Sequence, residues 1–221
     1  MTHSATGLIL RTWPLTETSL IIHWLTPDHG RIATVAKGAR RPRSPFLGRL
    51  DLFYLADFSF ARSRHSDLHT LREVCLRDTH GALRQDIGRL RQAAYVAAFV
   101  EQATETDTPL PAVYELVREF LGVLCRHPSA PQLVLAFELK LLQELGLKPD
   151  LEKTGLTPGA RQIVRALTQP DWAAGLRLKL TDAQAAELEQ FLHGFLIFQL
   201  GRLPKGRDAA LAGNAGRPRT K

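Results

Sequence analysis

The feature that most constrains the fold is a change in hydrophobic period near residue 78. Before it, apolar residues recur at every second position in short runs, which is typical of strands that are buried on one face. After it, they recur at spacings of three and four, which is typical of amphipathic helices. We therefore predict a two-domain α+β chain, with the boundary between Arg77 and Gly81.

The first domain, residues 1–79, is predicted to form a small β-barrel. Five strand-like runs lie within about seventy residues, and each is rich in β-branched or aromatic residues. A five-stranded barrel of the oligonucleotide/oligosaccharide-binding (OB) class is the fold that fits them best. The runs are GLILRTWP, TSLIIHWL, GRIATVAKG, RLDLFYLADFSFAR and LHTLREVCLR.

The second domain, residues 80–203, is predicted to be a bundle of helices, because its amphipathic segments need one another to bury their apolar faces. Phe191, Phe195 and Phe198 recur at helical spacing, and we expect them in the core of the bundle. Residues 204–221 are basic and have no hydrophobic period, so most of this tail is expected to be disordered.

Basic residues are concentrated towards the two ends of the chain. The net charge is +7, and Lys and Arg outnumber Asp and Glu by 11 to 7 in residues 1–80 and by 6 to 1 in residues 201–221. The stretch AKGARRPRSPFLGRL contains no acid and carries five cations: Lys37, Arg40, Arg41, Arg43 and Arg49. Such segregation favours a polyanion-binding surface, because each neutralised phosphate releases counterions. The same surface would be extended by Arg31, Arg62 and Arg64 at strand ends.

These cations have two interpretations. The simpler one is a solvated loop that only keeps the protein soluble. Charges of both signs would serve solubility as well, however, and this stretch has no acidic residue. Arginine also binds phosphate through two parallel hydrogen bonds and stacks on bases. We therefore predict that the loop binds nucleic acid. Most aromatic residues of the domain are expected in its core, with one or two at most serving as stacking platforms: Trp13, Trp24, Phe53, Tyr54, Phe58 and Phe60.

The sequence contains no recognisable catalytic or metal-binding motif. The dipeptide Gly-Lys, which a Walker loop requires, does not occur, and neither do GxSxG, HExxH and GxGxxG. His65 and His69 flank Asp67, but a solvated hairpin explains them better than a metal site. Cys75 and Cys125 are interpreted as small buried side chains. We expect no catalytic residue, cofactor or metal, and, without a membrane span or signal peptide, a cytoplasmic location.

Taken together, these residues resemble the bacterial RecO family of recombination and repair mediators. The resemblance is most specific in WPLTETSLIIHWLTPDHGRIATVAKGARRPRSPFLGRLDLF. There Glu-Thr-Ser enters the second strand, Gly-Arg opens the third, and Lys-Gly-Ala-Arg ends it. The resemblance recurs in FELKLLQELGLKPDL, residues 137–151, and more weakly in LGRLPKGRD, so that it covers most of the chain.

The resemblance implies an OB-fold that binds single- and double-stranded DNA, attached to a helical domain. It also implies a non-enzymatic activity, namely annealing complementary strands and helping to load recombinase onto gaps coated by single-strand-binding protein. RecR would be a partner. By the family pattern, the phosphate contacts would be made by Lys37, Arg40, Arg41, Arg43 and Arg49.

The chain departs from the family pattern in two places. Many members carry four zinc-binding cysteines after a Leu-Gly-x-x-Pro stretch, whereas DLEKTGLTPGAR has none, so we expect no zinc. The family's helical domain also receives the acidic, Phe-ending tail of single-strand-binding protein, often just before Phe-Glu-Leu. Leu135 and Ala136 occupy that place here, so the tail carboxylate would be bound by Arg118, Arg126 or Lys140.

Two other functions are compatible with the sequence. One is an RNA-binding OB-fold protein, because such barrels bind either nucleic acid. The other is a protein-interaction adaptor whose basic loop docks an acidic partner. Competition between DNA and RNA oligonucleotides separates the first from a DNA-binding protein. Partner capture that survives nuclease, together with absent DNA binding, would favour the second.

Overall fold

The fold is described by a computed structural model of the 221-residue chain, which covers residues 2–212. Contacts divide the chain into two compact units. The first combines the residues up to Ala82 with Ala103–Gly122, and the second combines Leu83–Gln102 with the residues from Val123 onward. All five strands precede the helices, which confirms the predicted two-domain α+β class.

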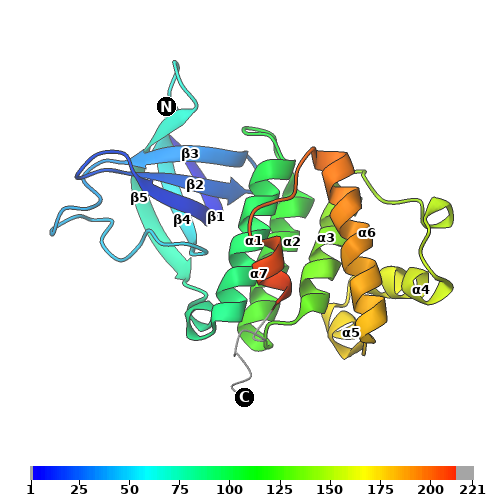
Figure 1. The fold of residues 1–221 in the computed structure, drawn as a ribbon. Helices are drawn as coiled ribbons and strands as arrows, with labels where there is room; N and C mark the ends of the chain where they lie inside the picture. The colour runs from blue at the N-terminus through cyan, green and yellow to red at the C-terminus, as the bar shows by residue number, and fades with distance from the viewer. Residues whose placement is uncertain (1, 213–221) are drawn as a thin grey trace. The chain divides into compact units, whose positions relative to one another are not determined.

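Five strands close into a barrel in the first unit (Figure 1). Their order around the barrel is β1-β2-β3-β5-β4, in which β3 and β5 are parallel and every other neighbouring pair is antiparallel. This is the predicted OB-type barrel. The strands are β1 (Thr2–Pro14), β2 (Leu20–Thr26), β3 (Gly30–Ala36), β4 (Leu55–Ala61) and β5 (Leu68–Asp78).

Aromatic side chains fill the interior of the barrel. Trp24 on β2 stacks on Phe58 of β4 with the ring centroids 4.0 Å apart, and its Nε1 donates a 2.8 Å hydrogen bond to Thr34 Oγ1 on β3. Because the indole is fully buried, leaving this N–H without an acceptor would cost about 1–3 kcal/mol. Of the aromatic residues expected mostly in the core, those that are buried are Trp24, Phe53, Phe58 and Phe60, and those that are half-buried are Trp13 and Tyr54.

The fourth strand is shorter than its sequence pattern indicates. Period-two alternation predicts a strand over residues 49–62, but β4 begins at Leu55. Phe53 has a left-handed backbone conformation, with φ of 65°, and its N–H donates to Ile9 O at 2.8 Å. This conformation interrupts an extended run. Residues 37–54 are therefore a long loop between β3 and β4.

The chain after β5 is helical, as predicted. The central helix of the second unit is α3, which is buried continuously from Leu133 to Leu142 and packs with α4, α5, α6 and α7. Thr181 and Gln184 form a capping box at the start of α6. The helices are α1 (Ile87–Ala103), α2 (Pro111–Arg126), α3 (Pro131–Glu144), α4 (Pro158–Leu167), α5 (Trp172–Arg177), α6 (Asp182–Leu200) and α7 (Arg207–Leu211), with 3-10 helices η1 (Gly81–Gln85) and η2 (Leu151–Lys153).

Residues 103–122 pack with the barrel, so the units do not follow a single division near residue 79. Thr106 forms a parallel β-bridge with Arg31 on β3, and the Asp107 N–H donates to Arg31 O at 2.9 Å. The sequence places this segment among the helices of residues 80–203. The packing of this segment with the barrel depends on contacts with residues far away along the chain. A local hydrophobic period does not reveal such contacts.

Part of the C-terminal tail, most of which is expected to be disordered, forms the ordered helix α7. Arg207 of α7 is 4% exposed and donates to both carboxylate oxygens of Glu138 on α3, at 2.7 and 3.0 Å. The Tyr95 hydroxyl donates to the same carboxylate at 2.5 Å, and burial beside it raises the pKa of Tyr95 well above its usual range. A cation that reads as solvated tail charge therefore anchors a helix. Residues 213–221 of the predicted tail lie outside the described residues.

The phenylalanines of α6 were expected in the core of the bundle, but they do not lie there. Leu188, Leu192 and Leu196 form the buried face of this helix, whereas Phe198 is 82% exposed. Phe191 and Phe195 stack on each other, with ring centroids 5.7 Å apart, and are half-buried. Both stripes repeat at helical spacing, so the period alone did not show which one the bundle buries.

Within residues 2–212, no helix has the length and apolar character needed to cross a membrane.

Candidate nucleic-acid interface

The β3–β4 loop gathers the five cations that the sequence singles out. Gly38 follows β3 with φ of 69°, a left-handed conformation that favours glycine, and it turns the chain sharply into the loop. The side chains that the loop exposes are Lys37, Arg40, Arg41, Arg43 and Arg49.

Buried side chains and backbone hydrogen bonds hold this loop on the barrel. Ala39 and Phe46 are only 6% and 7% exposed and belong to the barrel core. The Arg40 N–H donates to Thr18 O at 3.0 Å, which ties the loop to the turn between β1 and β2. The cations are thus presented by a fixed backbone, which lowers the entropy lost when they bind a ligand.

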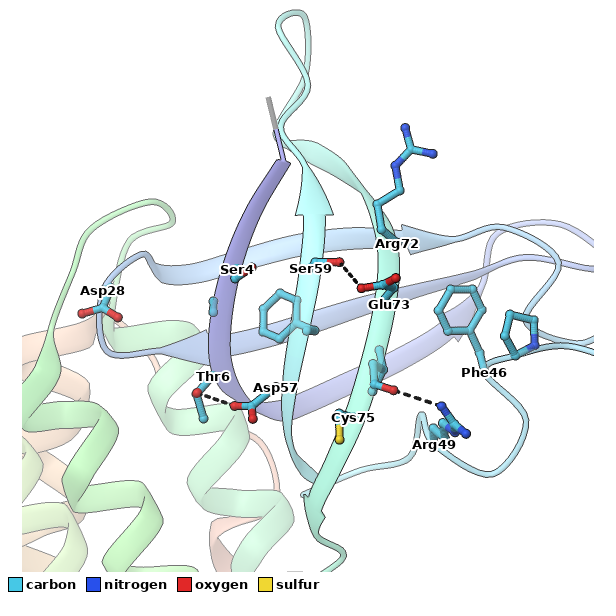
Figure 2. Close-up of a pocket in the computed structure, with 14 residues that line it drawn as sticks. Ser4, Thr6, Asp28, Phe46, Arg49, Asp57, Ser59, Arg72, Glu73 and Cys75 are labelled. Atoms are coloured by element: carbon cyan, nitrogen blue, oxygen red, sulfur yellow. Dashed lines mark hydrogen bonds between the residues drawn. The ribbon is translucent and has the colours of Figure 1, made fainter.

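Two of the five cations also fix the loop through their guanidinium groups. Arg40 Nη1 donates to Thr16 O at 3.4 Å, and Arg49 Nη1 donates to Val74 O on β5 at 3.2 Å (Figure 2). Phe46 lies on the same stretch of loop and enters the barrel core. Arg49 therefore acts at least in part by positioning the loop, and the sequence pattern could not distinguish that role from a phosphate contact.

Carboxylates do not neutralise the other cations of the loop. Within residues 2–212, Lys37, Arg40, Arg41 and Arg43 form no ion pair. Arg77 shows the contrasting case, since its Nε lies 2.6 Å from Asp57 Oδ2. Unpaired guanidinium groups keep their donors available for phosphate oxygens.

The predicted cations at the opposite end of β3 are mostly engaged within the protein. The Arg31 guanidinium donates to the Thr104 hydroxyl and carbonyl at 2.8 and 2.5 Å, and Arg62 lies 2.5 Å from Asp107. Arg64 is exposed and has no ion pair within the described part of the chain. A seven-residue strand spans about 20 Å, so these residues do not join the β3–β4 loop in one cluster.

The outward face of β1, β2 and β3 lies beside the basic loop. Trp13 pairs with Ile21, and Ile21 pairs with Val35, so these side chains form a row across three strands. The Trp13 ring contacts the ring of His23 with centroids 4.2 Å apart and planes at 65°. Both rings are half-buried. The sequence indicated Trp13 only as one of six aromatic residues from which a stacking platform could come. The strand register was needed to place it on this face.

A hollow of about 690 Å³ on the barrel is lined by charges of both signs (Figure 2). Its charged lining residues are Asp28, Asp57 and Glu73 on one side and Arg49 and Arg72 on the other. The hydroxyl of Thr6 and the guanidinium of Arg77 both donate to Asp57 at 2.6 Å, and these bonds lower the pKa of the Asp57 carboxyl. The carboxylate is therefore ionised at neutral pH and is paired with Arg77. The loop meets the hollow at Pro45, Phe46 and Arg49, whereas Lys37, Arg40, Arg41 and Arg43 do not line it.

The cysteines and the histidine pair differ from their expected surroundings. Cys75 is exposed at the hollow, contrary to expectation, because it lies on the outward face of β5, and Cys125 is half-buried. His69 is 2% exposed and stacks on Phe60, whereas His65 is exposed, so the two do not form a surface pair. Among residues 2–212, no group of three or more His, Cys, Asp or Glu side chains is placed to hold a metal ion.

The three cations proposed for a partner's carboxylate have different surroundings. Lys140 is 8% exposed, and its Nζ donates to the carbonyls of Gln169 and Pro170 at 2.5 and 3.2 Å. Arg118 is exposed and pairs with Glu115 at 2.6 Å. Arg126 is exposed at the end of α2. The buried ammonium of Lys140 therefore serves the second unit's own packing.

Two family models match the chain. The model described as recombination protein O N terminal matches residues 1–80, and the model described as recombination protein O C terminal matches residues 84–157. The first match coincides with the barrel, including its basic loop.

Curated proteins similar to this chain are named DNA repair protein RecO. The protein from Anaeromyxobacter dehalogenans (strain 2CP-C) is 33% identical over 147 residues, which cover 66% of this chain and 58% of the relative. The protein from Bacillus subtilis (strain 168) is 32% identical, with 66% and 56% covered. The protein from Cyanothece sp. (strain PCC 7425) is 30% identical over 176 residues, with 79% and 59% covered. The match thus spans less than two thirds of the length of each relative. Because the two family models together match residues 1–80 and 84–157, the chain belongs to the RecO family.

Proposed function

We propose that this chain acts in DNA repair and homologous recombination as a mediator that binds single- and double-stranded DNA. It anneals complementary strands and assists the loading of recombinase onto gaps coated by single-strand-binding protein. The observation that carries the proposal is the β3–β4 loop, on which Lys37, Arg40, Arg41 and Arg43 are exposed and have no carboxylate partner within residues 2–212. The names of the similar proteins support a repair role.

The mechanism follows from charge neutralisation. Two complementary strands repel each other through their phosphates, and a loop that neutralises phosphates of both lowers this repulsion. Base pairing can then nucleate, and no covalent bond is made or broken, so the proposed activity is non-enzymatic. Phosphate contacts carry no base information, and sequence preference should therefore be weak. Such a protein would work on the chromosome, in the cytoplasm.

The proposed contacts are ranked by the surroundings of each cation. Lys37, Arg41 and Arg43 bind phosphate directly, whereas Arg40 and Arg49 both bind phosphate and position the loop. Arg64 extends the surface as an outlying contact. Arg31 and Arg62 contribute less, because Thr104 and Asp107 already occupy their guanidinium groups.

The proposed protein partners are RecR and the acidic tail of single-strand-binding protein. Of the three cations considered for the tail carboxylate, Arg126 is the first choice, because it is exposed. Arg118 would have to leave Glu115, and Lys140 would have to leave two backbone carbonyls. Loss of tail-peptide binding in Arg126→Ala, with binding retained in Arg118→Ala, is the expected result.

Charge reversal on the loop tests the proposal. The triple variant Arg40→Glu, Arg41→Glu, Arg43→Glu should lose DNA binding and strand annealing. Its unfolding midpoint should change little, because the three side chains are exposed and the Arg40 hydrogen bond to Thr16 O is long, at 3.4 Å. The matched control reverses three exposed lysines of the second unit: Lys148→Glu, Lys179→Glu, Lys205→Glu. Both variants change the net charge equally. A loss of DNA binding in the loop variant but not in the control therefore indicates a binding site on the loop.

The outcomes distinguish the proposal from the two alternatives. Unchanged DNA affinity in the loop variant, or an equal loss in the control, contradicts the assignment. Tighter binding of RNA than of DNA of matched sequence would indicate an RNA-binding protein instead. Absent DNA binding, with nuclease-resistant capture of an acidic protein that the loop variant no longer captures, would indicate an adaptor.

A further inference from the structure

We infer that Trp13 is a stacking platform for one unpaired base of the bound strand. The inference rests on the proposed function, since it names the part of a nucleic acid that one side chain beside the basic loop contacts. Trp13 lies on β1, is half-buried, and belongs to the outward face of the barrel rather than to its core.

The strand register places Trp13 next to the cationic loop. It lies opposite Ile21, which lies opposite Val35, and Lys37 follows Val35 by two residues. Neighbouring strands are about 4.8 Å apart, so Trp13 and Val35 are separated by about 10 Å across the sheet. A strand whose phosphates bind the loop can therefore lay a base on this face. The outward face of strands two and three is also where OB barrels hold oligonucleotides.

The contact with His23 orients the indole and leaves a surface for a base. The two rings meet at 65°, an edge-to-face arrangement that aromatic pairs favour. In this arrangement the imidazole covers at most one face of the indole. The opposite face of the indole is the one proposed to accept a base, and the exposed fraction of Trp13 is consistent with that role.

The other two tryptophans have packing roles that Trp13 lacks. Trp24 is 0% exposed and donates to Thr34 inside the barrel. Trp172 is 8% exposed and lies 4.1 Å beneath the Lys140 ammonium in the second unit. A large aromatic side chain that is left partly in water beside a cationic loop has the composition of a base-stacking site.

Stacking adds a selectivity that phosphate contacts lack. Every base has a π-face, so stacking tolerates any sequence. In a duplex that face is covered by neighbouring base pairs, so only an unpaired base can use the indole. The platform should therefore favour single-stranded over double-stranded DNA and hold one strand with its bases accessible to a complement.

A comparison of two oligonucleotides measures the contribution of the Trp13 indole to binding. Thymidine oligonucleotides of about 20 residues are compared with abasic deoxyribose-phosphate chains of equal length, at one salt concentration. The wild-type protein should bind the thymidine chain about 5- to 150-fold more tightly, which is the range for stacking of one base. Trp13→Ala should lose most of that ratio while its affinity for the abasic chain changes less than about two-fold.

Two further variants separate stacking from folding. Trp13→Phe keeps an aromatic ring and should retain part of the thymidine preference. Leu15→Ala removes an apolar side chain that is 46% exposed next to β1, and it should leave the ratio unchanged. Because Trp24 and Trp172 are buried, tryptophan fluorescence should be quenched by the thymidine chain in the wild type and not in Trp13→Phe.

The possible failures are distinguishable. If Trp13→Ala weakens binding of both chains equally, or if saturating thymidine oligonucleotide does not quench the wild-type fluorescence, Trp13 does not stack on a base and the inference is wrong. If the wild type binds neither chain, the proposed function itself fails and the inference fails with it.

Discussion

Arginines that look alike along the chain have three different roles at the scale of single residues. Arg43 is exposed on the β3–β4 loop and has no ion pair within residues 2–212. Arg49 donates to a carbonyl of β5, and Arg207 is buried against Glu138. The partners of Arg49 and Arg207 are 25 and 69 residues away, so local sequence could not assign these roles. Of these three arginines, only Arg43 has the solvated surroundings that its sequence context indicates.

Substitution of Arg49 and Arg43 should separate positioning from binding. Arg49→Ala loses the hydrogen bond to Val74 O and should lower the free energy of unfolding by about 1 kcal/mol, in addition to weakening DNA binding. Arg43→Ala should weaken DNA binding with no change in stability. Urea unfolding and DNA titration of both variants are the measurements. Equal stability of the two variants would show that Arg49 does not position the loop.

His69 should make the barrel less stable in acid. Burial is the main reason that the pKa of His69 lies below its usual 6.5; Asp107 and Asp67 oppose this shift, and Arg62 and His3 add to it. The unfolded chain then binds a proton that the folded chain does not, so the free energy of unfolding falls as the pH falls below about 6.5.

The measurement compares urea unfolding at about pH 7.5 and about pH 5.5 in the wild type and in His69→Gln. The variant lacks this titrating group, so it should lose less stability between the two pH values than the wild type does. All other side chains are the same in the two proteins, so the comparison cancels their contribution. Identical losses would mean that His69 does not titrate as its burial indicates.

At the scale of elements, a hydrophobic period identifies an element better than it identifies the face that is buried. Alternation in the first seventy or so residues predicted five strands, and five strands form the barrel. The period of α6 predicted a helix, but its two apolar stripes repeat equally, and the bundle buries Leu188, Leu192 and Leu196 rather than Phe198. Alternation over residues 49–54 misled, because the left-handed backbone at Phe53 breaks the strand.

Helix α7 should be an integral part of the second unit. Arg207→Ala leaves the fully buried Glu138 carboxylate without its cation, and breaking a buried pair in this way typically costs about 3–5 kcal/mol. The double variant Arg207→Met, Glu138→Leu removes both charges and should recover much of the loss. Chemical denaturation checks both values. A loss of less than about 1 kcal/mol in Arg207→Ala would show that the tail is only loosely attached.

At the scale of the whole molecule, the net charge of +7 favours association with polyanions, and local pairing decides which cations are available to bind them. The sequence indicated a charge-rich loop whose cations have no acid nearby along the chain, and these cations are exposed; that they bind phosphate stays a prediction. It did not indicate that Thr104 and Asp107 engage Arg31 and Arg62. That pairing depends on residues 103–122 folding back onto β3, a contact between distant parts of the chain.

The salt dependence of DNA binding tests the central claim most directly. If four to six cations contact phosphates, log K should fall against log salt concentration with a slope of roughly −3 to −5. Neutralising three of them in Arg40→Ala, Arg41→Ala, Arg43→Ala should make the slope shallower by about 2 to 3, since each lost contact removes about 0.7 to 0.9. The same slope in the variant and the wild type would show that the phosphates bind elsewhere, and it would contradict the assignment of the β3–β4 loop.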